Sequence, residues 1–471
     1  MGTEIGHTHF TEKEWPEFSD RLKKETALLQ EKAEKGECSR RAPVGGFEIE
    51  AWLVDETMRP APRNTEFLRY LHDDMASMEL AKFNFELNNA PHPLCGDAFS
   101  KFAEEMHRHC RTANTTAERL GLRALTIGIL PTAHPSDFCL ENMSELKRYR
   151  ALNEQVLRER GGEPVWLDIA GETERLKMRH DSVMLEAAAT SFQIHTQVPF
   201  EEAHHYYNAS ILASAATVAV SANSPFLFGK ALWHETRIPL FEQSVDTGEG
   251  RPRVSFGSGF ARRSILECFL ENRDEYDILL PILFEEETDR FSHLRLHNGT
   301  IWRWNRPLVG FDEDGTLHFR IEHRVMASGP TLVDMLANAA FYYGLAASLA
   351  KRVARKERID DFETAKANFY RAARRGLEAT IVWEGKELKI RSLILEKLLP
   401  LAHEGLESLD LDGKETGRYL SIIESRAAKG QNGARWQLSF VRNHGKDMKK
   451  MTEAYWHHQQ IGEPVHTWSL K

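Results

Sequence analysis

The feature that most constrains this chain is a strict alternation of polar and apolar side chains in four segments: GFEIE (46–50), FNFELN (83–88), SFQIHTQV (191–198) and FRIEHRV (319–325). Successive side chains of a β-strand point to opposite faces, so this period of two predicts strands with one buried face. An apolar face opposite a polar one is typical of antiparallel sheets. The polar positions are Glu48 and Glu50; Asn84, Glu86 and Asn88; Ser191, Gln193, His195 and Gln197; and Arg320, Glu322 and Arg324.

If these polar faces converge, they form a cup that suits metal ions and phosphate. Carboxylates brought so close together repel one another and stay partly protonated unless a cation binds between them. Oxygen ligands with a single imidazole suit Mg²⁺ or Mn²⁺ better than zinc, and the planar forks of arginine suit phosphate. For any one strand, a solvated sheet face is the commoner explanation of the same pattern. None of the four polar faces contains a lysine, however, and this favours the cup.

Helical patterns separate the predicted strands. Amphipathic or apolar periodicity predicts helices at 11–36, 97–120, 144–160, 200–222, 264–288 and 331–352. A short apolar strand is expected at 123–131, and FDEDG is a turn between the strand candidates GTIWRWNRPLVG and GTLHFRIEHRV. After about residue 385 no strand alternation is convincing, so we expect a helical C-terminal region, 386–471, packed on the core. The fold class is therefore α+β, with a mainly antiparallel sheet and helices packed outside it.

Composition indicates a soluble, cytoplasmic protein. The 471 residues allow a large core, and the net charge of −9 argues against nucleic-acid binding and against a polybasic membrane anchor. The five cysteines are scattered without a CxxC pair, so we interpret them as packing residues in a reducing compartment. The most apolar run, 335–350, is shorter than the roughly 20 residues that cross a bilayer, and it predicts a buried helix. The polar N-terminus has no signal-peptide core.

The ordered motifs of this chain resemble the glutamate–cysteine ligase type of carboxylate–amine ligase, in the glutamine synthetase-like superfamily. The resemblance covers roughly residues 43–385 and rests on GFEIE, FELNNAP, SFQIHTQV, ANSPFLFGKALWHETRIPLFEQ, GTIWRWNRP and RIEHRVMASGPTL. It implies a sheet curved into a funnel, with ATP entering at one end, the amino-acid substrates at the other and magnesium ions between them. It also implies that 43–385 is the catalytic domain, preceded by a helical lead-in, 1–42.

Carried over by position, the resemblance implies a set of site residues. The implied metal ligands are Glu48, Glu50, Glu79, Glu86, His195 and Glu322. His195 and Arg324 would also contact the nucleotide phosphates, and Arg320 would contact phosphate or support Glu322. Glu79 fits only if a bulge or turn interrupts SMELAKFNFE.

The resemblance also implies substrate contacts. Arg237 in HETRIPLF would hold the carboxylates of the acyl substrate, Arg306 and Trp302 would complete that pocket, and Gln193 would bind the substrate amino group. Two features stay open. Arg148 and Tyr149 stand where family members carry a similar pair, but they also fit a helix surface. ERLKMRHD (174–181) could contact nucleotide, although a solvated charge run is the commoner explanation.

The expected reaction is ATP-dependent formation of an amide, with glutamate as the expected acid and an acyl phosphate as the intermediate. The sequence does not name the amine, and it leaves open whether the chain forms a homo-oligomer. A guanidino-type phosphotransferase is one alternative, because such kinases share a related sheet. A metal-dependent hydrolase would need more histidines in the cup than His195 alone. A non-catalytic binding relative is the last alternative, and the full set of metal ligands speaks against it.

Overall fold

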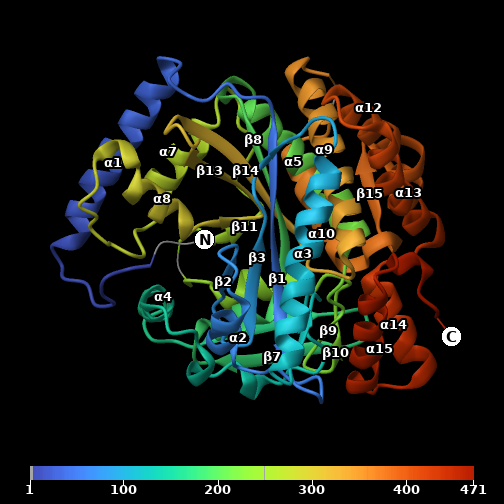
Figure 1. Cartoon of the computed structure of the whole chain (residues 1–471). Coiled ribbons are helices and arrows are strands. Elements are labelled where there is room, and N and C mark those ends of the chain that lie inside the picture. The colour runs from blue at the N-terminus through green and yellow to red at the C-terminus, as the bar shows by residue number, and fades with distance from the viewer. Residues whose placement is uncertain (1–3, 249, 358, 471) are drawn as a thin grey trace.

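A curled antiparallel sheet lies at the centre of the computed structural model, which describes residues 4–248, 250–357 and 359–470 (Figure 1). The strand order is β13-β14-β8-β1-β3-β2, and β4 and β5 also pair with β1. The four alternating segments fall in β14, β8, β1 and β3, which are consecutive neighbours. The predicted α+β fold with a curved, mainly antiparallel sheet is therefore confirmed. The strands are β1 (Val44–Val54), β2 (Ala76–Met78), β3 (Asn84–Asn88), β4 (His92–Pro93), β5 (Arg123–Leu125), β8 (Ser191–Val198), β13 (Asn305–Phe311) and β14 (Leu317–Ala327).

Helices cover the apolar face of the sheet. α5 (Phe200–Ser221) packs against β14 and α9, and α9 (Leu332–Ala354) lies beside it (Figure 1). Within the described chain α9 alone is long and apolar enough to cross a bilayer, but 89% of its most apolar window is buried inside the protein. This matches the predicted core helix. The other helices are α1 (Glu14–Glu34), α2 (Asn64–Leu71), α3 (Ala98–Arg119), α4 (Lys147–Glu159), α6 (Arg237–Ser244), α7 (Leu266–Glu275), α8 (Ser292–Gly299), α10 (Phe362–Arg375), α11 (Ile390–Leu393), α12 (Leu399–Ser408), α13 (Gly413–Lys429), α14 (Gly433–His444) and α15 (Met448–Ile461).

His323 belongs to this apolar face. Its Nδ1 lies 2.6 Å from Asn305 Oδ1, its Nε2 lies 2.9 Å from the Thr217 hydroxyl, and its ring stacks on Tyr342 at 4.1 Å. Burial lowers the pKa of His323 to about 3. The histidine of FRIEHRV is thus a neutral core histidine with both ring nitrogens partnered, and it points away from the polar face.

Two predicted elements are shorter than expected. The strand expected at 123–131 ends at Leu125. Beyond it the chain packs so tightly that a Cβ on Gly128 would lie 2.9 Å from Cβ of Ala327. The helix expected at 264–288 ends at Glu275, because Tyr276 takes an extended conformation with φ −122° and ψ 130°.

The C-terminal helices pack on α9, and one strand pair interrupts the region expected to be helical. Arg426 of α13 donates to Asp334 of α9 at 2.7 Å, and both side chains are fully buried. β15 (Thr380–Trp383) and β16 (Lys386–Lys389) form a hairpin across the expected boundary at 386. Its two turn residues, Glu384 and Gly385, both have positive φ angles, as tight hairpin turns require. Each strand is too short for its alternation to be recognised in the sequence.

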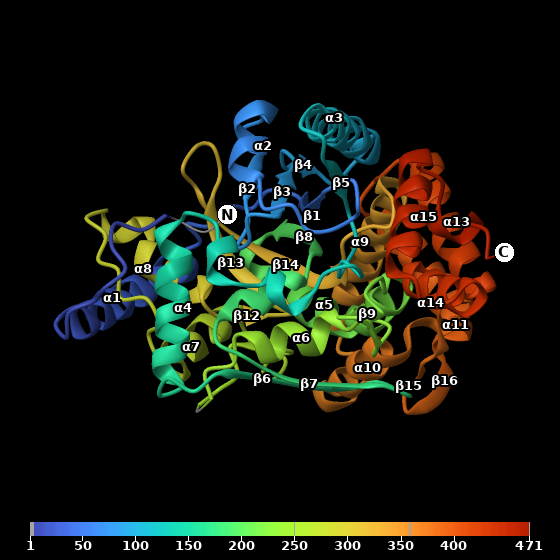
Figure 2. The same cartoon turned by 90° about the horizontal axis from the view of Figure 1, so that it is seen from below.

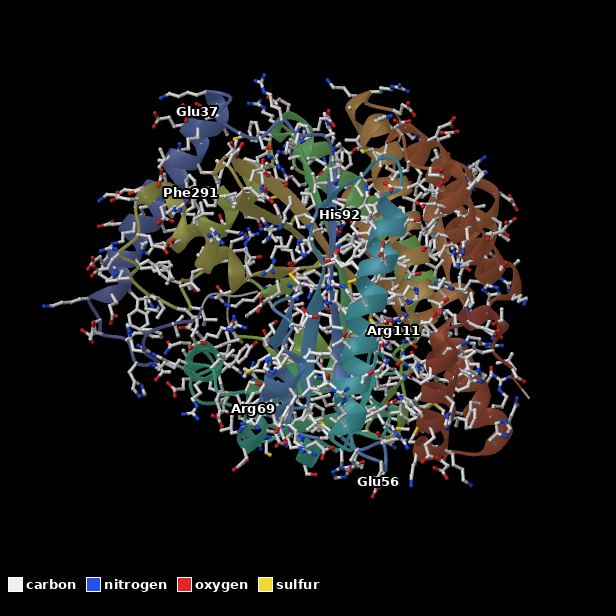
Figure 3. All side chains as sticks on the ribbon, viewed as in Figure 1. Glu37, Glu56, Arg69, His92, Arg111 and Phe291 are labelled. Carbon is white, nitrogen blue, oxygen red and sulfur yellow. The ribbon has the colours of Figure 1, made fainter. Side chains whose placement is uncertain are left out.

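Three smaller strand pairs lie apart from the central sheet, and charged side chains lie on the outside. ERLKMRHD falls on β7 (Arg175–His180), which pairs with β6 (Val165–Ala170) away from the central sheet (Figure 2). The remaining pairs join β9 (Phe226–Leu227) to β10 (Lys230–Ala231) and β11 (Val254–Ser255) to β12 (Trp302–Arg303). Charged side chains such as Glu37, Glu56 and Arg111 are exposed at the surface (Figure 3). The polar face of β1, β3, β8 and β14 is different, because most of its charged side chains are buried inside the protein.

Candidate functional site

The polar face of the sheet lines a cavity of about 280 Å³. The helices α4, α6 and α8 contribute residues to its other walls. Ten predicted site residues line this cavity: Glu48, Glu50, Glu79, Glu86, Gln193, Trp302, Arg306, Arg320, Glu322 and Arg324. The structure thus brings together residues that lie as much as 276 positions apart, from 48 to 324.

Strand register decides which of these side chains meet. Glu322 of β14 lies opposite His195 of β8, and Glu50 of β1 lies opposite Glu86 of β3. Residues directly opposite on an antiparallel pair have their side chains on the same face and in contact range. The register therefore builds one acidic row on β1 and β3 and one mixed row on β8 and β14.

Glu322 is held by arginines from two strands. Arg306 Nε and Nη2 each donate to a Glu322 carboxylate oxygen at 2.9 Å, and Arg324 Nη1 donates to Oε2 at 3.1 Å. Although burial acts in the opposite direction, these guanidinium charges and His195 hold the pKa of Glu322 down to about 2. Glu322 is therefore an ionised, fully oriented carboxylate. Arg306, predicted as a substrate contact, uses its Nε and Nη2 in hydrogen bonds to Glu322.

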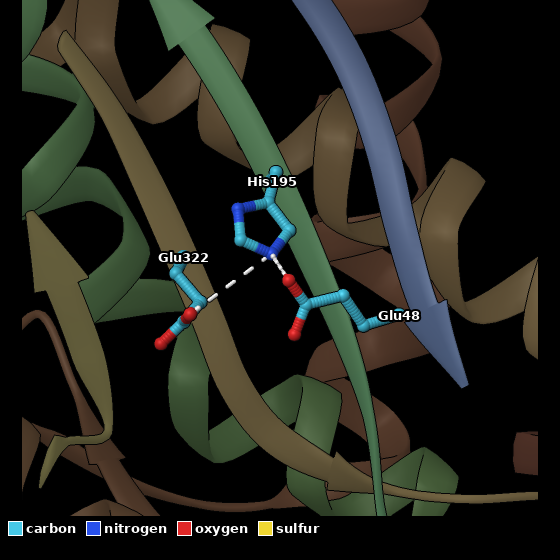
Figure 4. A group of neighbouring side chains, drawn as sticks. All are labelled: Glu48, His195 and Glu322. Carbon is cyan, nitrogen blue, oxygen red and sulfur yellow. Dashed lines mark ion pairs between the residues drawn. The ribbon is translucent and has the colours of Figure 1, made fainter. Parts of the chain in front are cut away.

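His195 lies between two carboxylates (Figure 4). Its Nε2 is 3.0 Å from Glu48 Oε1 and 4.0 Å from Glu322 Oε1, and its Nδ1 accepts from Arg320 Nε at 3.2 Å. Among the described residues, Glu48, His195 and Glu322 form the one group of histidine, cysteine and carboxylate side chains whose ligand atoms lie within 4.8 Å of one another. Although burial would raise the pKa of Glu48, its charge interaction with His195 keeps that pKa below the ordinary value.

This trio fits a hard divalent cation. The buried Nε2 of His195 is close to Glu48 but has no partner of hydrogen-bonding geometry. Two carboxylates and one imidazole that converge without a directed hydrogen bond among themselves are the donor set expected for Mg²⁺ or Mn²⁺ with oxygen-rich ligation. To bind the cation through Nε2, His195 would carry its proton on Nδ1 and give up the hydrogen bond from Arg320.

The remaining carboxylates repel one another. Burial, followed by the charge of Glu48, raises the pKa of Glu86 to about 7. Burial and the charges of Glu86 and Glu50 raise the pKa of Glu79 well above its usual value. Glu79 follows the end of β2, in the turn that the sequence required for it to reach the site. An uncompensated cluster of this kind fits a second bound cation, because divalent cations relieve the repulsion.

Glu50 is held by three hydrogen bonds, all from residues of β8. Its oxygens accept from the Ser191 backbone N–H at 2.6 Å, the Ser191 hydroxyl at 2.8 Å and Gln193 Nε2 at 2.7 Å. Burial still raises its pKa. Because Gln193 Nε2 faces Glu50, its Oε1 takes the other direction, where it is buried without a hydrogen-bond partner. This orphaned acceptor suits a donor such as an amino group.

Arg237 is not among the residues that line the cavity, so its contact with the substrate carboxylates stays a prediction. Its Nε pairs with Glu235 at 3.2 Å, and its Nη2 donates to the Val325 carbonyl at 2.7 Å. The side chain is 3% exposed. HETRIPLF therefore supplies an internal ion pair that supports the backbone of β14 directly beside Arg324.

Several cavity residues were missed or left open by the sequence. Glu186, in a short turn of 3-10 helix (Val183–Ala188), and Arg295, on α8, both line the cavity and were missed. Burial, followed by the charge of Glu50, raises the pKa of Glu186 to about 8. Arg148 and Tyr149, which the sequence left open, also line the cavity. The one available signal for Glu186 was a carboxylate isolated in the apolar stretch SVMLEAAAT.

Residues 44–459 match the profile of glutamate–cysteine ligase family 2. The protein belongs to this family. Membership confirms the resemblance inferred from the motifs and supports a carboxylate–amine ligase as the class of enzyme. No curated protein sequence matches the chain.

Solved structures show the same fold. A glutamate–cysteine ligase from Francisella tularensis, in complex with AMP, superposes with a TM-score of 0.54 at 11% identity, covering 92% of this chain and 91% of that one. A bifunctional glutathione synthetase from Pasteurella multocida gives a TM-score of 0.50 at 11% identity, over 93% of this chain and 55% of that one. This chain thus spans about half of the bifunctional protein. At such identities the likeness shows the fold alone.

Proposed function

We propose that this protein is an ATP-dependent carboxylate–amine ligase that forms a γ-glutamyl amide through an acyl phosphate. The observation that carries the proposal is a single cavity in which Glu48, Glu86 and their neighbours face Arg320 and Arg324. Phosphoryl transfer to a carboxylate brings two anions together, so it needs cationic groups and metal ions around the transferred group.

The trio of Glu48, His195 and Glu322 would hold one divalent cation, Mg²⁺ or Mn²⁺, with Glu50, Glu79 and Glu86 as the ligands of a further one. Such cations neutralise charge on the phosphoryl oxygens. Family membership and the AMP complex of the Francisella tularensis enzyme support ATP as the phosphoryl donor.

The protein's own residues would orient the reactants. Arg320 and Arg324 would bind the transferred phosphoryl group of ATP while an oxygen of the substrate carboxylate attacks it and ADP leaves. The amine nitrogen then attacks the acyl carbon, phosphate departs and the nitrogen loses a proton. Gln193 Oε1, which lacks a donor, would accept from the substrate amino group, and Trp302 would line its pocket.

Product analysis tests this proposal. The protein is incubated with ATP, Mg²⁺, glutamate and a panel of amines, and ADP and new amides are measured by mass spectrometry. Hydroxylamine is included, because it converts an acyl phosphate to a hydroxamate whatever the natural amine is. A phosphorylated guanidine without amide would support the phosphotransferase instead, and ATP binding without any product would support a non-catalytic relative.

Glu48→Gln supplies the matched test of the site. The variant should lose cation-dependent turnover and stay folded, whereas Glu404→Gln, at an exposed position on α12, should keep it. Full activity of Glu48→Gln would remove Glu48 from the metal site.

A further inference from the structure

Helix α4 uses two different faces for two different contacts. One face lines the cavity through Arg148, Tyr149 and Leu152. The other face carries residues three or four positions apart, which lie on one side of a helix. These residues contact the segment 4–15 at the N-terminal side of α1, and they are Lys147, Ala151, Glu154 and Arg158.

The contacts between this segment and α4 run along the whole helix. The Lys147 backbone N–H donates to Glu4 Oε1 at 2.8 Å, and Lys147 Nζ donates to the Gly6 carbonyl at 2.7 Å. Ile5 packs on Ala151, which is fully buried. In the last turn, the guanidinium of Arg158 lies 5.0 Å from the centre of the Trp15 ring. The segment therefore holds the helix at both ends.

The same segment also holds the opposite wall of the cavity. Ile5, 4% exposed, packs against Leu280 and Ile282, and Leu296 joins this cluster. Trp15 Nε1 donates to the Ile278 carbonyl at 3.3 Å. Leu280 and Leu296 themselves line the cavity. The start of the described chain thus runs between α4 and α8 (Figures 1 and 2).

We propose that residues 4–15, here called the strap, position the α4 wall against the 278–296 wall and thereby set the fit of the amino-acid substrate. The strap precedes the residues that match the family, 44–459, whereas both walls lie within them. Ile5 is its central positioning residue, because it shares one buried hydrophobic cluster with Ala151 of the α4 wall and with Leu280 and Ile282 of the other wall. The guanidinium of the α4 wall suits a carboxylate, and the proposed function assigns the ATP phosphates to Arg320 and Arg324, so the amino-acid substrate is affected rather than ATP. This inference rests on the proposed ligase function.

Four variants of the full-length protein test the strap. Ile5→Ala removes most of the Ile5 side chain from the cluster that joins both walls, and Ile5→Val keeps most of it. Ile461→Ala makes the same change at a position that is 67% exposed on α15, and Ile422→Ala makes it at a buried position on α13 that is 7% exposed. Hydrogen–deuterium exchange of the α4 amides and steady-state kinetics are measured for each variant.

In Ile5→Ala the α4 amides should exchange faster than in the wild type. The KM for the amino-acid substrate should rise by about tenfold, which corresponds to a loss of about 1.4 kcal/mol in binding free energy. The kcat and the KM for ATP should change less than twofold, and Ile5→Val should behave nearly as the wild type. Unchanged α4 exchange in Ile5→Ala would overturn the proposal, and so would the same rise in KM in Ile422→Ala. If the wild type forms no amide, the ligase function fails, and the exchange data still decide whether the strap fixes α4.

Discussion

Replacing Glu86 with glutamine should stabilise the cation-free protein at pH 8, although it removes a predicted metal ligand. Glu86 is 4% exposed and lies opposite Glu50 in the sheet. Burial and the charge of Glu48 raise its pKa from the ordinary value of 4.5 to about 7. Above pH 7 the folded protein must therefore keep an ionised carboxylate in a place that disfavours it.

The size and sign of this effect follow from proton linkage. Between pH 4.5 and about 7 the folded state holds the proton on Glu86 and the unfolded state does not, so the free energy of unfolding falls as pH rises through this window. Since one pKa unit corresponds to about 1.4 kcal/mol, ionisation of Glu86 costs about 3 kcal/mol at pH 8. Glutamine removes this cost but weakens the hydrogen bond from Asn88 Nδ2, 2.8 Å long, by about 1 kcal/mol. Glu86→Gln should therefore raise the free energy of unfolding by about 2 kcal/mol at pH 8 and leave it nearly unchanged at pH 5.

Urea unfolding in EDTA, followed by tryptophan fluorescence at pH 5 and pH 8, measures this difference. Glu404→Gln on the exposed surface of α12 is the matched control and should change stability at neither pH. Saturating Mg²⁺ should stabilise the wild type at pH 8 and stabilise Glu86→Gln much less, because ligand binding to the folded state raises its stability. A Glu86→Gln variant that is equally destabilised at both pH values would refute the reasoning.

Three further predictions concern other groups of the protein. Arg306→Lys keeps the charge but cannot make two parallel bonds to Glu322, so it should lower the free energy of unfolding by about 1–3 kcal/mol in urea titrations; an unchanged midpoint would contradict the described pairing. The pKa of Glu322 is lowered to about 2, so its contribution is complete above pH 4.5 and is lost as pH falls towards 2; Glu322→Gln should therefore be less stable than the wild type at pH 7, with the gap closing in acid unfolding curves. Cys95 is exposed, whereas burial raises the thiol pKa of Cys38 to about 11 and of Cys110 to about 12; a thiol reagent at pH 7 should label Cys95 first, and Cys95→Ser should keep full activity.

Much of the site could be predicted because alternation is a property of the local sequence. The period of two in β1, β3, β8 and β14 fixes which side chains share a face, without knowledge of the partner strands. Register is different, because it depends on how strands pair and a slip by one residue reverses every face. The bidentate contact between Arg306 and Glu322 follows from such a register. The sequence therefore identified both residues but not their direct pairing.

Two other differences have the same origin in tertiary structure. Arg237 stands in a motif that fits a substrate site, yet Glu235 and the carbonyl groups of β14 take up its donors. Nothing local in HETRIPLF reveals where those acceptors lie. Glu186 sits in a short 3-10 turn without periodicity, so only its contact with the cavity identifies it.

The strand order itself explains why the cavity keeps its charges available. β1 and β3 carry Glu48, Glu50 and Glu86, β13 and β14 carry the arginines, and β8 separates the two groups with Gln193 and His195. If β14 were the neighbour of β3, arginines and carboxylates would neutralise one another as buried ion pairs and leave little to bind a ligand. With β8 between them, the carboxylate wall stays short of cations, and the arginine wall, although Arg306 pairs with Glu322, keeps Arg324 Nε without a hydrogen-bond partner. The proposed substrate, a nucleotide that carries a divalent cation, would satisfy both walls at once.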